Sequence, residues 1–205
     1  MTVIDSCSFD KSFYAREYEK NNTSAFTGMS QEDNLRATSA LLDYLRGSRE
    51  DIVVLAKVGS QEREVFNERE TRHMVDVRAL YQKAVSARNI MALLTAFLLV
   101  YLIGKEKLSI PEILRMGFRE GVMIIVIFVL FVAVWALADF NAFWTNFHLL
   151  LFDNDLWLLD PNTSIMINLF PGSFFFDLVI RIILIYLALI LGISLYAFFP
   201  WRKAS

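Results

Sequence analysis

Hydrophobic and polar positions divide this chain into a polar N-terminal region and a C-terminal region with three long apolar runs. The runs cover residues 84–103, 122–138 and 178–200, whereas the first 88 residues carry most of the charge. A helix that crosses a bilayer needs about 20 mostly apolar residues. Each run therefore predicts a transmembrane helix, and the pattern indicates an all-α membrane protein rather than a soluble core.

The short loops predict the orientation of these spans. Loop 104–120 holds four basic residues and the C-terminal tail two more, whereas loop 139–177 holds none. By the positive-inside rule, loop 104–120 is cytoplasmic and the aromatic loop 139–177 is extracytoplasmic. Three spans then place residues 1–83 outside too, as a mainly helical domain of a multi-pass plasma-membrane protein. Because nothing near Met1 resembles a signal peptide, we expect a fourth, N-terminal span that is missing from this sequence.

Within residues 1–83 two helix starts can be recognised. Ser30 with Asp33 resembles a capping box and predicts an amphipathic helix that ends at Gly47. Asn67 with Glu70 is a better capping pair and predicts a helix that leads into the first span. Residues 51–59 fit either a short strand or a segment in contact with lipid, and the sequence does not decide between them.

The second of these helices carries a stripe of Glu70, His73 and Asp76, spaced three residues apart. A carboxylate in the stripe could hold His73 in one tautomer and leave its other ring nitrogen free. Alternatively, Glu70 is a cap and Asp76 a solvated charge. The Glu-x-x-His spacing also occurs in di-iron bundles, but those sites need a second pair and further carboxylates, which the spans do not supply. We expect no metal and no cofactor.

The aromatic loop contains the second histidine. Trp144, His148 and Phe152 repeat every four residues and would share a helix face, and Trp157 adds to the aromatic surface. Such a helix can lie in the membrane interface. Arg181, a few residues into the third span, could snorkel to a lipid phosphate or pair with Asp177.

Composition narrows the classes of function. The net charge of −2 argues against a nucleic-acid partner, which would need a basic face. Cys7 is the only cysteine, so an intramolecular disulfide is excluded. The chain has only two histidines, both predicted near the outer membrane surface, and this suggests proton chemistry there.

The strings FNERETRHMVDVRALY and FWTNFHLLLF, followed by Trp157 and LFPGSFFFD, resemble a family of bacterial integral membrane proteins that includes the lipoprotein intramolecular transacylase. The resemblance implies a four-span protein with an extracytoplasmic domain. It also implies transfer of an acyl chain from the glycerol sn-2 oxygen of a diacylglyceryl cysteine to the amine of that cysteine, which gives a lyso-form lipoprotein. Diacylated lipoproteins and membrane lipid would be the partners. By motif the catalytic pair would be His73 and His148, and we add Glu70, Asp76, Trp157 and Arg181 as supporting residues.

Acyl transfer to an amine needs a base and an acid, and histidine can serve as either near neutral pH. Our first hypothesis makes His73 the base, oriented by Asp76 or Glu70, and His148 the acid, with the reverse left open. In a straight helix His73 would stand about 16 Å above Ala84, at 1.5 Å per residue. Because lipid chemistry needs His73 nearer the bilayer, we predict a bend between Asp76 and Arg88 or a helix that lies along the membrane.

Two other hypotheses remain open. A non-enzymatic scaffold or sensor predicts that the two histidines lie far apart. An intramembrane protease of the prenyl-endopeptidase type would explain the spacing of Phe143, Trp144 and His148, but its paired-glutamate motif is absent from the sequence.

Overall fold

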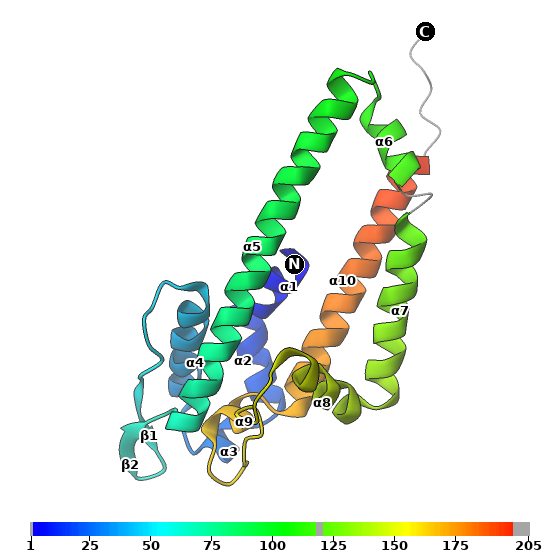
Figure 1. Ribbon diagram of the computed structural model, residues 1–205. Coiled ribbons are helices and arrows are strands. Elements are labelled where there is room, and N and C mark those ends of the chain that lie inside the picture. The colour runs from blue at the N-terminus through cyan, green and yellow to red at the C-terminus, as the bar shows by residue number, and fades with distance from the viewer. Residues whose placement is uncertain (1, 118–120, 199–205) are drawn as a thin grey trace.

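The computed structural model describes residues 2–117 and 121–198, and most of these are helical (Figure 1). Its elements are α1 (Thr2–Ser8), α2 (Lys11–Lys20), α3 (Thr23–Thr27), α4 (Gln31–Arg46), β1 (Leu55–Val58), β2 (Gln61–Glu64), α5 (Glu68–Gly104), α6 (Ile110–Gly117), α7 (Met123–Ala138), α8 (Phe140–Leu151), α9 (Ile165–Leu169) and α10 (Gly172–Phe198). In Figure 1 the long helices α5, α7 and α10 extend away from a group of shorter elements that surrounds the first turns of α5 and α10.

Among the residues that the structure describes, two helices, α5 and α10, are long and apolar enough to cross a membrane. The predicted span 84–103 forms the second half of α5, and the predicted span 122–138 corresponds to the shorter apolar helix α7. Helix α10 begins at Gly172, before the predicted start of the third span at residue 178. Residues 199 and 200 of that predicted span lie outside the described part of the chain.

The loops between these helices are themselves partly helical. Loop 104–120 contains α6, and loop 139–177 folds into α8, α9 and the first turn of α10. In both loops the apolar pattern continues over too few residues to predict a span, but over enough residues for a helix of two or three turns.

The predicted helix starts are confirmed, and each has its cap. The Asn67 side chain accepts a hydrogen bond from the Glu70 backbone N–H at 3.0 Å, and the Glu70 carboxylate accepts one from the Asn67 N–H at 2.5 Å. Ser30 caps α4 through one side-chain hydrogen bond, with its hydroxyl accepting from the Asp33 N–H. Gly47 ends that helix at a φ of 83°, a conformation that favours glycine.

Residues 51–59 form a strand and the approach to it, which decides between the two interpretations of this segment. Strand β1 pairs antiparallel with β2, and Leu55 lies opposite Glu64. Ile52, Val54 and Ala56 are buried, so alternate side chains face the core. The turn contains Gly59, whose φ of 62° again requires a residue that tolerates the left-handed region.

Helix α5 is uninterrupted from Glu68 to Gly104, so the predicted bend between Asp76 and Arg88 is wrong. Sharp bends in helices occur almost always at Pro, at Gly or at an inserted side chain, and residues 76–88 contain neither Pro nor Gly. The helix also passes the predicted domain boundary at residue 83 without a break. His73 therefore stays far from the apolar part of α5, and another element must bring the rest of the site to it.

A cluster of buried aromatic side chains forms the centre of the fold. It joins α2, α9 and α10, with ring centroids 5.1 Å apart for Tyr14 and Phe174 and 6.0 Å apart for Tyr14 and Phe170. Burying one such side chain contributes roughly 1.5–3 kcal/mol. The cluster fixes the first turns of α10 against α2, and so fixes the end of the molecule where the two histidines lie.

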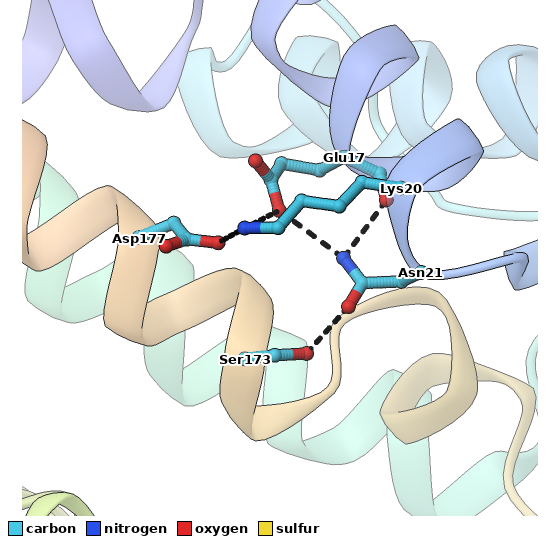
Figure 2. A network of polar contacts seen from close by, with 5 residues as sticks. All are labelled: Glu17, Lys20, Asn21, Ser173 and Asp177. Atoms are coloured by element: carbon cyan, nitrogen blue, oxygen red, sulfur yellow. Dashed lines mark hydrogen bonds and ion pairs between the residues drawn. The ribbon is translucent and has the colours of Figure 1, made fainter.

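Polar side chains tie the end of α2 to the start of α10 beside this cluster (Figure 2). Lys20 pairs with Asp177 and lies 3.9 Å from Glu17. The Asn21 amide donates to Glu17, and its oxygen accepts from the Ser173 hydroxyl at 2.6 Å. Burial, together with the nearby Asp177, raises the pKa of Glu17. The network joins two helices that are distant in sequence.

The sequence suggested that Arg181 could pair with Asp177. In the structure it does not, because Asp177 is paired with Lys20. Its guanidinium instead forms an ion pair with Asp10 at 2.7 Å and lies 5.2 Å above the ring of Phe13. An i−4 neighbour is only one of the partners available to a long side chain, and here the N-terminal cap of α2 competes successfully. Arg181 thus connects α10 to α2 and has no recorded contact with either histidine.

Candidate functional site

The two histidines lie side by side. Their ring centroids are 6.2 Å apart with an interplanar angle of 33°, and the side chains are only 8% and 7% exposed. His73 comes from the second turn of α5, and His148 from the last turn of α8. The long helix α5 and the shorter helix α8, distant in sequence, therefore meet to form one imidazole pair, and the scaffold hypothesis, which required distant histidines, loses its main expectation.

Helix α8 brings His148 to His73 without any bend in α5. Asp139 ends α7 in an extended conformation and caps α8 by accepting a hydrogen bond from the Ala142 N–H at 2.9 Å. The chain turns sharply there, and Figure 1 shows α8 directed from the end of α7 towards the first turns of α5. The site is assembled at the level of His73, rather than by lowering His73 towards the apolar half of its own helix.

Aromatic rings enclose the pair. Phe152 contacts both imidazoles, with centroid distances of 5.3 Å to His73 and 5.8 Å to His148. Trp144 and Trp157 both lie 4.9 Å from His148, the first edge-on and the second stacked on the imidazole. These rings exclude water from the imidazoles and leave few groups that could stabilise a charge on them.

This environment keeps both imidazoles neutral near pH 7. The pKa of His73 is lowered to about 4, mainly by burial and to a smaller extent by the neighbouring His148, while the Asp76 carboxylate opposes the shift. Burial also lowers the pKa of His148, against the effect of its hydrogen bond to the Trp144 carbonyl. In both cases desolvation of the charged form outweighs the interactions that favour it.

The hydrogen bonds indicate which nitrogen of each neutral ring carries the proton. His148 Nδ1 lies 2.8 Å from the carbonyl oxygen of Trp144. Because a carbonyl only accepts, Nδ1 of the neutral ring must be the donor, and Nε2 has a free lone pair. Nδ1 of His73 is buried without a hydrogen-bond partner. An N–H there would be unsatisfied, so the proton of His73 belongs on Nε2.

Neither carboxylate of the predicted stripe orients His73 by a hydrogen bond. The fully buried Glu70 carboxylate accepts from the Ser164 hydroxyl at 2.5 Å and the Met166 N–H at 2.7 Å, besides its own cap. Asp76 accepts from the Asn154 amide at 2.9 Å. Both residues therefore attach the segment between α8 and α9 to α5, and the reason is that this segment offers better-placed donors than the imidazole.

Two residues of that segment escaped prediction from sequence. Asn154 and Ser164 lie in a stretch rich in Asn, Asp, Pro and Ser, which resembles an ordinary loop. The sequence contains no signal that they reach α5. Trp157, which was predicted, stacks on His148 and donates its indole N–H to the Asn154 carbonyl at 2.9 Å. Within the described residues, no group of three or more potential metal ligands occurs.

The lowered pKa values can be tested by NMR of imidazole-labelled protein in detergent micelles. We expect His73 to titrate near pH 4, far below the usual histidine value of about 6.5. Since the unfolded chain takes up this proton near pH 6.5 and the folded chain only near pH 4, the folded state should lose stability as the pH falls through that window. A midpoint near 6.5 for His73 in the folded protein would contradict the buried neutral pair.

Fold and site together define a helical membrane protein with a buried, neutral histidine pair suited to proton transfer. A model of the lipoprotein intramolecular transacylase family, Lit, matches residues 1–175, and the chain belongs to this family. It is accordingly an enzyme that acts on lipoproteins by intramolecular acyl transfer. The protease hypothesis finds no support in this assignment.

Solved structures show the same fold. The membrane-integral lipoprotein intramolecular transacylase Lit from Bacillus cereus is 21% identical, with a TM-score of 0.74 over 96% of this chain and 84% of that one. A structure of the same protein with a histidine-to-alanine mutation is 19% identical, with a TM-score of 0.71 over 96% and 83% of the two chains. A search of curated proteins found no match.

Proposed function

We propose that His73 and His148 together catalyse the acyl transfer, from the glycerol sn-2 oxygen of a diacylglyceryl cysteine to the amine of the same cysteine. The observation that carries this proposal is the 6.2 Å separation of two buried imidazole rings. One ring offers a lone pair and the other an N–H, so an amine and an ester oxygen placed between them could exchange a proton.

The tautomers favour His148, rather than His73, as the base. His148 Nε2 has the free lone pair and takes a proton from the attacking amine, and the imidazolium so formed gives that proton to the leaving oxygen. His73 carries its proton on Nε2 and, as a neutral imidazole, donates a hydrogen bond to the developing oxyanion. The hydrogen bond from His148 Nδ1 to the Trp144 carbonyl supports this assignment.

The bonds and protons of the step balance without a further reactant. The cysteine nitrogen forms a bond to the acyl carbon, and the bond from that carbon to the sn-2 oxygen breaks. The amine gives a proton to His148, and the imidazolium of His148 then gives this proton to the sn-2 oxygen. Both imidazoles are neutral again at the end of the step. Since amine and ester belong to one molecule, the enzyme need only hold that molecule folded.

We place the pair at the extracytoplasmic surface of a multi-pass protein. Large apolar side chains are exposed along α5 from Ile90, along α7 and along α10, as expected of surfaces in contact with lipid. The opposite end of the molecule carries Lys105, Lys107 and Arg115, which the positive-inside rule assigns to the cytoplasm. Leu149 and Leu150, both exposed, follow His148 directly. They provide an apolar surface along which acyl chains can approach.

Trp157 should matter through its ring. Replacing Trp157 with alanine removes the stacked face of His148, and we expect turnover to fall about tenfold, because a small misplacement of a catalytic group is costly. Trp157→Phe keeps a ring but loses the indole N–H, so its turnover should lie between that of the wild type and that of Trp157→Ala. The turnover of each variant is measured with a diacylglyceryl-cysteine peptide. Trp135→Phe, on α7 and in contact with Phe131 and Phe143, is the control; equal losses in all three variants would contradict this role.

The proposal can be tested in cells. The chain is expressed in a bacterium that lacks its own transacylase, and the N-terminal peptide of an abundant lipoprotein is analysed by mass spectrometry. We expect an N-acyl, monoacylglyceryl cysteine that disappears in His73→Ala and in His148→Ala. A diacylglyceryl cysteine that persists unchanged beside well-expressed wild-type protein would refute the proposed reaction.

A further inference from the structure

Asn154 lies in the segment between α8 and α9 and makes three hydrogen bonds there. Its amide donates to the Asp76 carboxylate at 2.9 Å, and its side-chain oxygen accepts from the Leu156 N–H at 3.0 Å. Its backbone carbonyl accepts from the indole N–H of Trp157 at 2.9 Å. Asn154 therefore contacts α5 through its side chain and the Trp157 ring through its backbone carbonyl.

Both ends of this chain of contacts lead to a histidine. Asp76 follows His73 by one turn of α5, so it moves with His73. Trp157 stacks on His148 with centroids 4.9 Å apart and an interplanar angle of 28°. The histidines themselves do not hydrogen-bond to each other, and their separation of 6.2 Å must be set by what surrounds them.

We propose that Asn154 is a positioning residue: through Asp76 on one side and Trp157 on the other, it fixes the placement of His148 relative to His73. The inference rests on the proposed function of the pair. It assigns to Asp76 a role as hydrogen-bond acceptor for Asn154, in place of a role as charged partner of His73.

Two other contacts join the same segment to α5. Arg69 pairs with the Asp155 carboxylate at 3.3 Å and also donates to its backbone carbonyl. Both side chains of this pair are exposed, and exposed ion pairs contribute little. The buried Glu70 carboxylate, which accepts from Ser164, holds the segment close to α5, and the hydrogen bond from Asn154 to Asp76 then relates the Trp157 ring to that helix.

Substitutions at the two partners separate hydrogen bonding from charge. Asp76→Asn keeps an acceptor oxygen and removes the charge, whereas Asp76→Ala removes both. Asn154→Asp keeps the acceptor for Leu156 but loses the donor and sets two carboxylates against each other. We expect Asp76→Asn to retain most of the wild-type kcat, and the other two to lose about tenfold with KM little changed.

The indole N–H resonance of Trp157 supplies a readout that does not depend on activity. In tryptophan-labelled protein in lipid nanodiscs, assigned by its loss in Trp157→Phe, it should shift in Asp76→Ala and Asn154→Asp and stay in place in Asp76→Asn. Asn162→Ala is the matched control, because Asn162 lies in the same segment and its bonds go to Asp160; it should change neither kcat nor the resonance.

Two results would overturn the proposal. Equal losses of kcat in Asp76→Asn and Asp76→Ala would show that the charge matters, and an unmoved Trp157 resonance in Asn154→Asp would show that Asn154 does not place the ring. If wild-type protein does not turn over the peptide but the resonance still shifts as expected, the proposed function fails while the chain of contacts stands.

Discussion

Replacing either His73 or His148 with alanine is expected to lower the rate of acyl transfer about a thousandfold, within the range that general acid or base catalysis supplies. His148→Ala removes the group that takes the proton from the amine and returns it to the ester oxygen, and His73→Ala removes the hydrogen-bond donor to the developing oxyanion. Because the groups act as a unit, the double variant should be little worse than either single one. Product formation from a synthetic diacylglyceryl-cysteine peptide, followed by mass spectrometry with purified protein, gives these rates.

Exposed neighbours provide matched controls for each helix. Arg72 precedes His73 on α5, and Arg72→Ala removes only an exposed ion pair with Glu68. Asn146→Ala lies on the exposed part of α8, where its amide bonds to the Ala142 carbonyl. Both should react at close to the wild-type rate. A well-folded His148→Ala variant with a wild-type rate would remove His148 from the mechanism.

Glu70→Ala should have the largest effect on stability, about 4 kcal/mol. Hydrogen bonds to a charged group contribute about 1.5–3 kcal/mol each, and the substitution leaves the buried N–H of Met166 and the N–H of Asn67 without their acceptor. For a chain of this size the expected fall in Tm is about 10 °C. Thermal unfolding in detergent measures it, with activity expected to disappear together with the fold of the segment between α8 and α9.

A neighbouring glutamate separates this effect from loss of helix charge. Glu68 occupies the first turn of α5, as Glu70 does, but is exposed and forms only a long ion pair with Arg72. Glu68→Ala should change Tm little. Glu70→Gln keeps one acceptor oxygen, so its Tm should lie between those of Glu68→Ala and Glu70→Ala. If Glu68→Ala and Glu70→Ala were equally unstable, the buried network would not be what holds the segment.

Local signals in the sequence predicted much of the fold. The capping pair of Asn67 and Glu70 marked the start of α5, and the apolar runs marked the three long helices, because both signals depend on residues near each other in the chain. The bend in α5 was predicted only to satisfy a distance. That prediction failed because it considered only movement of His73 towards the bilayer. In the structure the chain turns at Asp139 instead, and α8 carries His148 to His73.

The structure brings three of the predicted site residues together, namely His73, His148 and Trp157, but their hydrogen-bond partners were not predicted. The two histidines and Trp157 could be singled out by rarity and motif, whereas their partners depend on contacts across the fold. Glu70 satisfies its own helix and a segment that follows α8, which a helical stripe cannot reveal. Asn154 resembles any turn asparagine until its contact with Asp76 is seen. Tautomers, too, follow only from neighbours such as the Trp144 carbonyl.

A crossover experiment tests the central claim most directly. Purified protein receives two diacylglyceryl-cysteine peptides together, one with an isotope-labelled sn-2 acyl chain and the other with an isotope-labelled peptide. Transfer within one molecule, catalysed by the pair of His73 and His148, predicts N-acylated products in which each acyl chain stays with its own peptide, and no product in either histidine-to-alanine variant. Labelled acyl chains on the labelled peptide, or products that survive loss of both histidines, would contradict this account.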